Sequence, residues 1–176
     1  MTLKEYITKP RIYCDMDGVL CNFDKGIFDV DGKTKPEDLI EGHPELDLWK
    51  HIQKNGSVAK FYAELDWHPE GKKLWEYLKT LPNVEILTSL GKSNPDKEGS
   101  KYGKLLWLKN HDIRIPTNFS QKAADKQYWV NNKNDILIDD YESNIRQWKQ
   151  AGGTAIHFTT AEKAIDDLRS YHEILR

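Results

Sequence analysis

The stretch Arg11–Leu20, which reads RIYCDMDGVL, decides the fold, because a short apolar run in it ends directly at an acidic residue. An apolar run before a polar or acidic residue returns three times further along the chain. Runs of this length and composition are typical of buried strands in a parallel sheet. The sequence therefore predicts four strands, at residues 11–14, 84–87, 136–138 and 154–158.

Amphipathic stretches separate these strands. Residues 69–81 carry apolar side chains at helical spacing, residues 101–111 repeat that spacing, and residues 142–151 end at a glycine pair. Strands that alternate with helices are typical of α/β proteins. We therefore expect an α/β fold with a doubly wound, Rossmann-like parallel sheet.

One connection is too long for a simple crossover. Roughly sixty residues separate Leu20 from Val84, whereas a crossover between parallel strands needs only a dozen or more. Residues 24–68 mix aromatic side chains with glycine, proline and charged residues. We expect them to form a small helical cap over the carboxyl edge of the sheet, with residues 1–23 and 69–176 as the core of a single structural domain.

The composition narrows the class of protein. The chain has 176 residues and a formal charge of −2, without a long basic block, which disfavours a nucleic-acid polymer as partner. Cys14 and Cys21 are too few for a disulfide framework, and neither the first ten residues nor any later run is apolar enough for a leader or a membrane span. We expect a cytoplasmic protein without a membrane partner, and the sequence leaves its oligomeric state open.

Polar side chains follow the predicted strands at the point where each strand ends. Ligands of open parallel sheets bind beyond the carboxyl ends of the strands, so these residues form the candidate site. Four carboxylates gathered there would repel one another unless a cation were bound, and hard oxygen ligands suit Mg²⁺. The candidate residues are Asp15, Asp17, Thr88, Ser89, Asp139 and Asp140.

The pair Asp15 and Asp17 is the sharpest signal. Carboxylates two positions apart, where a strand opens into a loop, can point the same way, and Gly18 would permit the turn that follows. One carboxylate could attack phosphorus to form an aspartyl-phosphate while the other transfers protons. Thr88 could donate to the phosphoryl oxygens, and a lysine could offset their charge.

With these motifs the chain resembles the haloacid-dehalogenase-like hydrolase superfamily. Residues 15–20, 86–89 and 137–140 match its first, second and fourth motifs, in the right order. Within the superfamily the sequence is most similar to the 5′(3′)-deoxyribonucleotidases and their bacterial and phage relatives. The further matches are Phe23, Glu64-Leu65, Pro69, Gly71, Lys104, Trp107, Asp125-Lys126, residues 141–145, Trp148, residues 151–153 and His157-Phe158.

The resemblance implies a role for each matched residue. It implies Asp15 as nucleophile, Asp17 as general acid and base, and a phosphate site at Thr88 and Ser89. It also implies Mg²⁺ held by Asp15, the backbone carbonyl of Asp17 and Asp140, with Asp139 as a direct or water-mediated support. An aspartate at position 17 argues against dehalogenation, which needs no acid there.

The resemblance leaves two assignments less defined. Lys126 matches the lysine of the third motif best, and Lys122 and Lys104 are nearby alternatives for this phosphate-binding role. Phe23 matches a position that contacts the nucleoside in relatives, where an aromatic face could stack on a base. The expected substrate is therefore a small phosphomonoester, foremost a ribo- or deoxyribonucleoside 5′-monophosphate.

Other interpretations remain open at this point. The same chemistry could serve a phosphate at a nucleic-acid end or a non-nucleotide metabolite. A non-enzymatic, receiver-like module that holds Mg²⁺ and phosphate would gain little from a proton-transfer group at Asp17. Asp139 and Asp140 could cap the helix near Glu142, and most aromatic side chains of the cap could be core. No zinc-ligand spacing joins the six histidines, which are His43, His51, His68, His111, His157 and His172.

Overall fold

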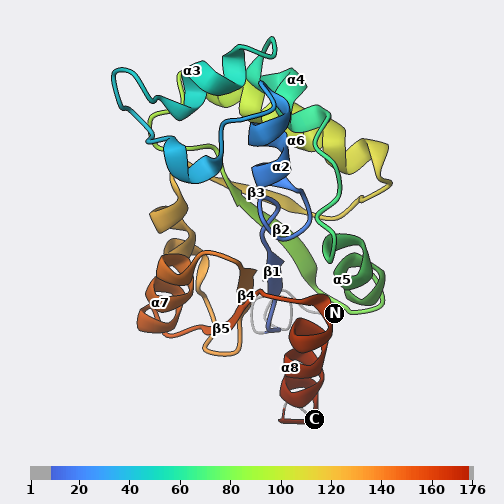
Figure 1. The fold of residues 1–176 in the computed structure, drawn as a ribbon. Helices are drawn as coiled ribbons and strands as arrows, with labels where there is room; N and C mark the ends of the chain where they lie inside the picture. Colours follow the sequence, from blue (N-terminus) through green and yellow to red (C-terminus); the bar gives the residue numbers. More distant parts are fainter. Residues whose placement is uncertain (1–8, 175–176) are drawn as a thin grey trace.

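The computed structural model describes residues 9–174, and a five-stranded parallel sheet runs through its centre (Figure 1). The strand order is β3-β2-β1-β4-β5. Every neighbouring pair is parallel, which confirms the doubly wound, Rossmann-like α/β fold. The strands are β1 (Ile12–Cys14), β2 (Val84–Ser89), β3 (Thr117–Ser120), β4 (Ile136–Asp139) and β5 (Thr154–His157).

The strand β3 was not predicted. Its sequence, TNFS, contains a single large apolar residue, so it lacks the apolar run by which the other strands are recognised. It lies at the edge of the sheet, pairs only with β2 and is mostly half-buried, so it needs no such run. Pairing with β3 also extends β2 through Thr88 and Ser89, two residues beyond the predicted end.

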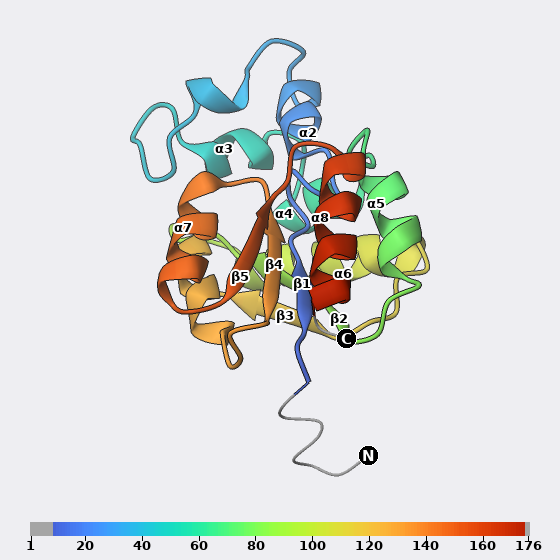
Figure 2. The same cartoon turned by 90° about the horizontal axis from the view of Figure 1, so that it is seen from below.

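Helices cover both faces of the sheet (Figure 2). α5 (Gly71–Leu78), α6 (Lys97–Asn110) and α8 (Ala161–Ile174) bury apolar side chains in one cluster with Ile12 and Ile86. α7 (Glu142–Gln150) and the 3₁₀ segment η2 (Ala123–Trp129) pack on the opposite face, around Tyr13 and Leu137. The core therefore has two layers, as expected for strands with a period of two.

The predicted helices exist with shifted ends. α6 begins four residues before the predicted start because the Asp96 side chain caps it, accepting from the Gly99 backbone N–H at 2.8 Å. α5 begins two residues after Pro69, and α8 had no counterpart among the predicted helices. No helix in residues 9–174 is long and apolar enough to cross a membrane.

Short helices fill the connection between β1 and α5. They lie above the carboxyl ends of the strands in Figure 1, where a cap was expected. Their buried side chains, among them Trp49, Ile52 and Phe61, belong to the same apolar cluster as the sheet, so the division into core and cap at residues 24 and 68 stays a prediction. The helices are α2 (Phe23–Asp29), η1 (Pro36–Asp38), α3 (Leu48–Gln53) and α4 (Val58–Ala63).

Two smaller expectations concern cysteines and chain ends. Cys14 and Cys21 are both buried free thiols, and burial raises the pKa of each well above its usual value.

Residues 1–8 and the side chain of His172 lie outside the described part of the chain. The expectations about a leader and about His172 therefore stay predictions.

Candidate active site

Asp15 lies immediately after β1 at the carboxyl edge of the sheet, where its side chain is 9% exposed. Its backbone N–H donates to the carbonyl of Ile138 at 3.0 Å, which continues the pairing of β1 with β4. Its Oδ1 accepts from the Met16 N–H at 2.7 Å, and its Oδ2 lies 2.7 Å from Lys126 Nζ. The orientation of the Asp15 carboxylate is therefore fixed by the backbone of its own loop and by the Lys126 ammonium.

Asp139 ends the neighbouring strand β4 and is fully buried. Its Oδ2 lies 2.6 Å from Lys126 Nζ, so one ammonium bridges Asp139 and Asp15. Its Oδ1 accepts from the Tyr141 N–H at 2.8 Å, and Asn144 Nδ2 donates to the same carboxylate. α7 (Glu142–Gln150) has Tyr141 as its N-cap residue and no side-chain cap hydrogen bond, so the capping alternative for Asp139 and Asp140 is wrong.

Asp140 points its carboxylate toward the turn that follows Asp17. A Cβ atom on Gly18 would lie 2.1 Å from Asp140 Oδ2, and Gly18 has a φ of +75°. Both the left-handed backbone and the lack of a side chain are therefore required there. The expected turn at Gly18 is confirmed.

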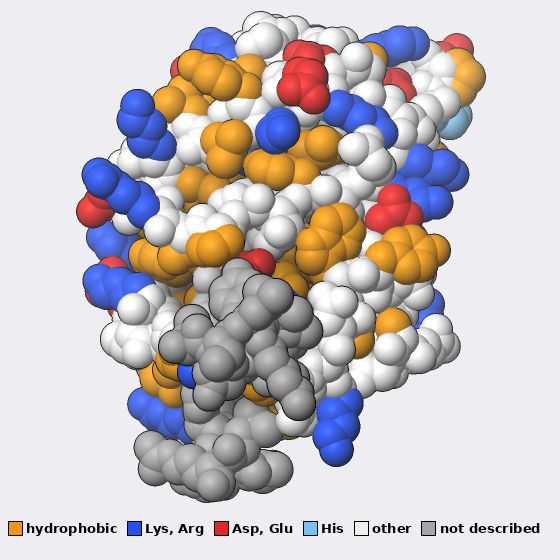
Figure 3. All heavy atoms as spheres, turned by 180° about the vertical axis from the view of Figure 1, so that it is seen from behind, with side chains coloured by type: hydrophobic (Ala, Val, Ile, Leu, Met, Phe, Trp, Pro, Cys, Tyr) orange, Lys and Arg blue, Asp and Glu red, His pale blue; other side chains and the backbone are white. Residues whose placement is uncertain are grey.

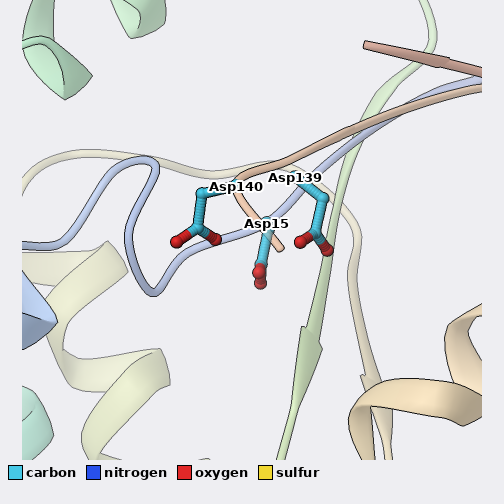
Figure 4. A group of neighbouring side chains, drawn as sticks. All are labelled: Asp15, Asp139 and Asp140. Atoms are coloured by element: carbon cyan, nitrogen blue, oxygen red, sulfur yellow. The ribbon is translucent and has the colours of Figure 1, made fainter. Parts of the chain in front are cut away.

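Asp15, Asp139 and Asp140 form one acidic cluster, in which each offers an oxygen within 4.8 Å of the others (Figure 4). Burial, opposed by Lys126 and reinforced by Asp139, raises the pKa of Asp15 to about 8. Burial and the Asp139 charge raise the pKa of Asp140 to about 6. Three carboxylates beside one lysine leave negative charge uncompensated, so the donor set fits a hard divalent cation.

Lys126 is the lysine that faces this cluster. Burial opposes its charged form, but the carboxylates of Asp139 and Asp15 together raise the pKa of its ammonium. Lys122, one of the two alternatives, is exposed and lies 3.7 Å from Asp125 rather than at the cluster. The structure therefore favours Lys126 over Lys122 as the lysine of the site.

Asp17 and Thr88 meet at the other alternative, Lys104. The Lys104 Nζ lies 2.6 Å from Asp17 Oδ2 and donates to Thr88 Oγ1 at 2.8 Å. Ser89 follows at the end of β2, half-buried, and its Oγ accepts from the Gly91 N–H at 3.1 Å. Two lysines thus reach the candidate residues, one from η2 and one from α6.

A pocket of about 200 Å³ opens at this edge of the sheet, and the fully buried Thr88, Asp139 and Lys104 do not line it. Asp15, Asp17, Asp140 and Lys126 line it together with Ser89 and Phe23. Phe23 also packs edge-on against Phe61 at 5.7 Å between ring centroids, so it is both cap core and pocket wall. A larger groove of about 730 Å³ lies at the opposite end of β2, beside Asn83 and Val84, away from the clustered carboxylates.

Five pocket residues were not among the predicted site residues: Gly18, Asp24, Ala123, Tyr141 and Asn144. Tyr141, directly after the Asp139-Asp140 pair, lines the pocket and is an exposed residue. Asn144 is buried on α7 and aims its amide at Asp139. A buried asparagine on the apolar face of an amphipathic helix was the available signal for Asn144, since buried polar groups need partners. For Tyr141 the available signal was its place in residues 141–145, which match the resembled family.

Comparison with known proteins supports the fold. No family model and no curated protein sequence matches the chain. A solved haloacid dehalogenase-like family hydrolase from Streptococcus pneumoniae is 18% identical, with 88% of this chain and 86% of that chain covered and a TM-score of 0.51. A hydrolase from Streptococcus pneumoniae TIGR4 is 14% identical, with 93% and 97% covered and a TM-score of 0.49. The likeness to the first of these structures shows that the chain shares its α/β fold.

Proposed function

We propose that the chain is a Mg²⁺-dependent phosphomonoester hydrolase that works through an aspartyl-phosphate on Asp15. One observation carries this proposal. Asp15, held by Lys126 within 2.7 Å, borders the same 200 Å³ pocket as Asp17 and Asp140. In that arrangement Asp15 would be the nucleophile and Asp17 the proton-transfer group. Lys126 would supply a positive charge, and the carboxylate oxygens would form the metal site. The fold shared with a solved hydrolase supports the same reading.

The first step would transfer the phosphoryl group to Asp15. An Asp15 oxygen bonds to phosphorus as the bond from phosphorus to the ester oxygen breaks, and Asp17 donates its proton to the departing oxygen. Lys126 offsets the negative charge at the attacked phosphoryl group, because its ammonium already lies beside the nucleophile. The departing group leaves as a neutral alcohol.

The second step would return Asp15 to its resting form. Asp17, now a carboxylate, takes a proton from water as the water oxygen bonds to phosphorus and the bond from phosphorus to Asp15 breaks. The products are inorganic phosphate and a protonated Asp17 ready for the next cycle. Thr88 and Ser89 would hold the phosphoryl oxygens during both steps.

The residues present fit Mg²⁺. Asp15 and Asp140 would hold it, with Asp139 as a direct or water-mediated support, because these carboxylates already gather within 4.8 Å. Bound Mg²⁺ would offset the charge of the phosphoryl group and of the carboxylates. The backbone carbonyl of Asp17 is a further predicted ligand.

The proposed substrate is a nucleoside 5′-monophosphate. Phe23 and Tyr141 both border the pocket, so aromatic surface is present for a base. On the face in Figure 3, basic side chains are scattered among acidic and apolar ones rather than gathered in a stripe. That face therefore offers no basic stripe of the kind that holds a nucleic-acid polymer through many phosphates.

Phosphate release tests the proposed function. A panel of nucleoside 5′- and 3′-monophosphates, sugar phosphates and p-nitrophenyl phosphate would be assayed with Mg²⁺ and with EDTA. Selective, Mg²⁺-dependent release from nucleoside 5′-monophosphates is expected. Release from sugar phosphates alone would move the substrate to another metabolite, and no release from any ester would contradict the proposal.

A further inference from the structure

Lys104 is a lysine with no contact to solvent. Its side chain is 0% exposed, although it belongs to α6, a helix whose other lysines are half-buried (Lys97) or exposed (Lys101 and Lys109). A buried ammonium is costly unless it is paired and hydrogen-bonded. The structure supplies such partners, and all of them lie at or beside the candidate active site.

The packing of α6 against the cap helix α4 sets the position of Lys104. A Cβ atom on the preceding residue, Gly103, would lie 2.3 Å from the carbonyl oxygen of Ala59, so the two helices approach closely only because position 103 is glycine. One turn further along, Trp107 Nε1 donates to the Leu65 carbonyl at 2.7 Å. The Lys104 side chain is therefore buried between the cap helix α4 and the sheet.

The Lys104 ammonium makes three interactions. Nζ contacts Asp17 Oδ2 at 2.6 Å and Thr88 Oγ1 at 2.8 Å, and it lies 4.4 Å from the centre of the Tyr62 ring. An ammonium has three N–H donors, so two oxygens and one aromatic face use all of them. Lys104 also does not line the pocket, whereas Lys126 does. Lys104 therefore acts on a ligand through its neighbours.

Lys104 donates to both oxygen partners, so each of them acts as a hydrogen-bond acceptor in this contact. Thr88 Oγ1 accepts from Lys104, so the hydroxyl hydrogen is left to donate to another acceptor. Asp17 is fixed through Oδ2, and its Oδ1 is buried without a hydrogen-bond partner among the described residues. Lys104 therefore fixes the orientation of the Asp17 carboxylate through Oδ2, at the edge of the pocket that Asp17 lines.

We propose that Lys104 is a positioning residue that holds Asp17 for proton transfer to the departing oxygen and stabilises the carboxylate that forms when the proton leaves. This inference rests on the proposed phosphatase function. The loss of kcat on removing Lys104 should therefore be larger for a leaving group that needs a proton than for one that is stable as an anion. Alkoxide leaving groups need one, whereas p-nitrophenolate is stable as an anion.

The test compares two substrates in Lys104→Met. For a nucleoside monophosphate that the wild type hydrolyses, kcat should fall by about 10²–10³, within the range that a proton-transfer group contributes. For p-nitrophenyl phosphate the loss should stay within about tenfold, because that step needs no acid. Lys109→Met, an exposed lysine on the same helix, is the matched control and should match the wild type on both substrates.

A double variant shows whether Lys104 works through Asp17. Asp17→Asn combined with Lys104→Met should be no slower on the nucleotide than Asp17→Asn alone, because the interaction is already lost. Additive losses would overturn the inference. If thermal unfolding shows that Lys104→Met does not fold, Lys104→Gln, which keeps one donor toward Asp17, should show the same selective loss at smaller size.

The outcomes separate the two proposals. Equal losses on both substrates in an active wild-type background would overturn the role of Lys104 and leave the phosphatase function standing. A wild type that hydrolyses neither substrate would overturn the phosphatase function, and the inference about Lys104 with it.

Discussion

Asp15 and Asp139, which stand at the ends of two neighbouring parallel strands, interact with one buried ammonium group, at 2.7 and 2.6 Å. Removing one partner of a buried charged pair leaves the other uncompensated, whereas here the ammonium keeps a second carboxylate if one is lost. The site therefore tolerates neutralisation of Asp15 better than an isolated ion pair would.

Asp15→Asn should abolish turnover without unfolding the chain. The proposed nucleophile is lost, so kcat should fall by roughly 10⁴ or more. Because burial raises the pKa of Asp15, the charged form is disfavoured in the folded state, and a neutral amide should leave the melting temperature unchanged or higher. Phosphate release and thermal unfolding measure the two effects. Retained turnover would rule out Asp15 as nucleophile.

Mg²⁺ should stabilise the folded chain. A ligand that binds only the folded state adds about 2.7 kcal/mol of stability at one hundred times its Kd, and the acidic cluster exists only in the folded state. The melting temperature should rise with Mg²⁺ concentration in the wild type and stay flat in Asp140→Asn. A rise of equal size in both proteins would mean that Mg²⁺ binds elsewhere.

The carboxyl edge could be predicted from sequence because parallel strands bring their ends together whatever the strand order. Asp15 and Asp139 followed or ended strands recognised by apolar runs, so their meeting needed only the fold class. The edge strand β3 could not be found in the same way, since a half-buried edge strand needs no apolar run.

The partners of the lysines were beyond the reach of sequence. Lys126 lies on η2 and Lys104 on α6. The position of each lysine along the sequence does not show which carboxylate it will contact. The contact of Lys104 with Asp17 depends on how closely α6 approaches α4, which is set by Gly103 and the Ala59 backbone. Such packing distances follow from side-chain shapes across the core, not from local pattern.

Gly18→Ala should weaken Mg²⁺ binding. The added methyl group would lie 2.1 Å from Asp140 Oδ2, and alanine is strained at a φ of +75°, so the Asp140 carboxylate must move. We expect a higher Mg²⁺ concentration for half-maximal activity, with a lower melting temperature. Gly152→Ala, at a positive φ but with nothing within 4 Å, is the matched control for backbone strain alone. Equal Mg²⁺ requirements in both variants would contradict the role of Gly18.

Phe23→Ala should reduce activity on nucleotides more than on p-nitrophenyl phosphate. The Phe23 ring borders the pocket, and stacking of a base on an aromatic ring contributes about 1–3 kcal/mol, or roughly 5- to 150-fold in affinity. The effect should appear mainly in KM for nucleoside monophosphates. Equal losses on both substrates would show that Phe23 acts only as core, through its packing on Phe61.

Trapping of the phosphorylated protein tests the central claim most directly. Asp17→Asn would be mixed with p-nitrophenyl phosphate and Mg²⁺ and quenched in acid, because this substrate needs no acid for the first step while the second step lacks its base. We predict a mass increase of one phosphoryl group on the peptide that contains Asp15, and none in Asp15→Asn/Asp17→Asn. Burst release of p-nitrophenol with the phosphoryl group on another residue, or with none on the protein, would contradict the account.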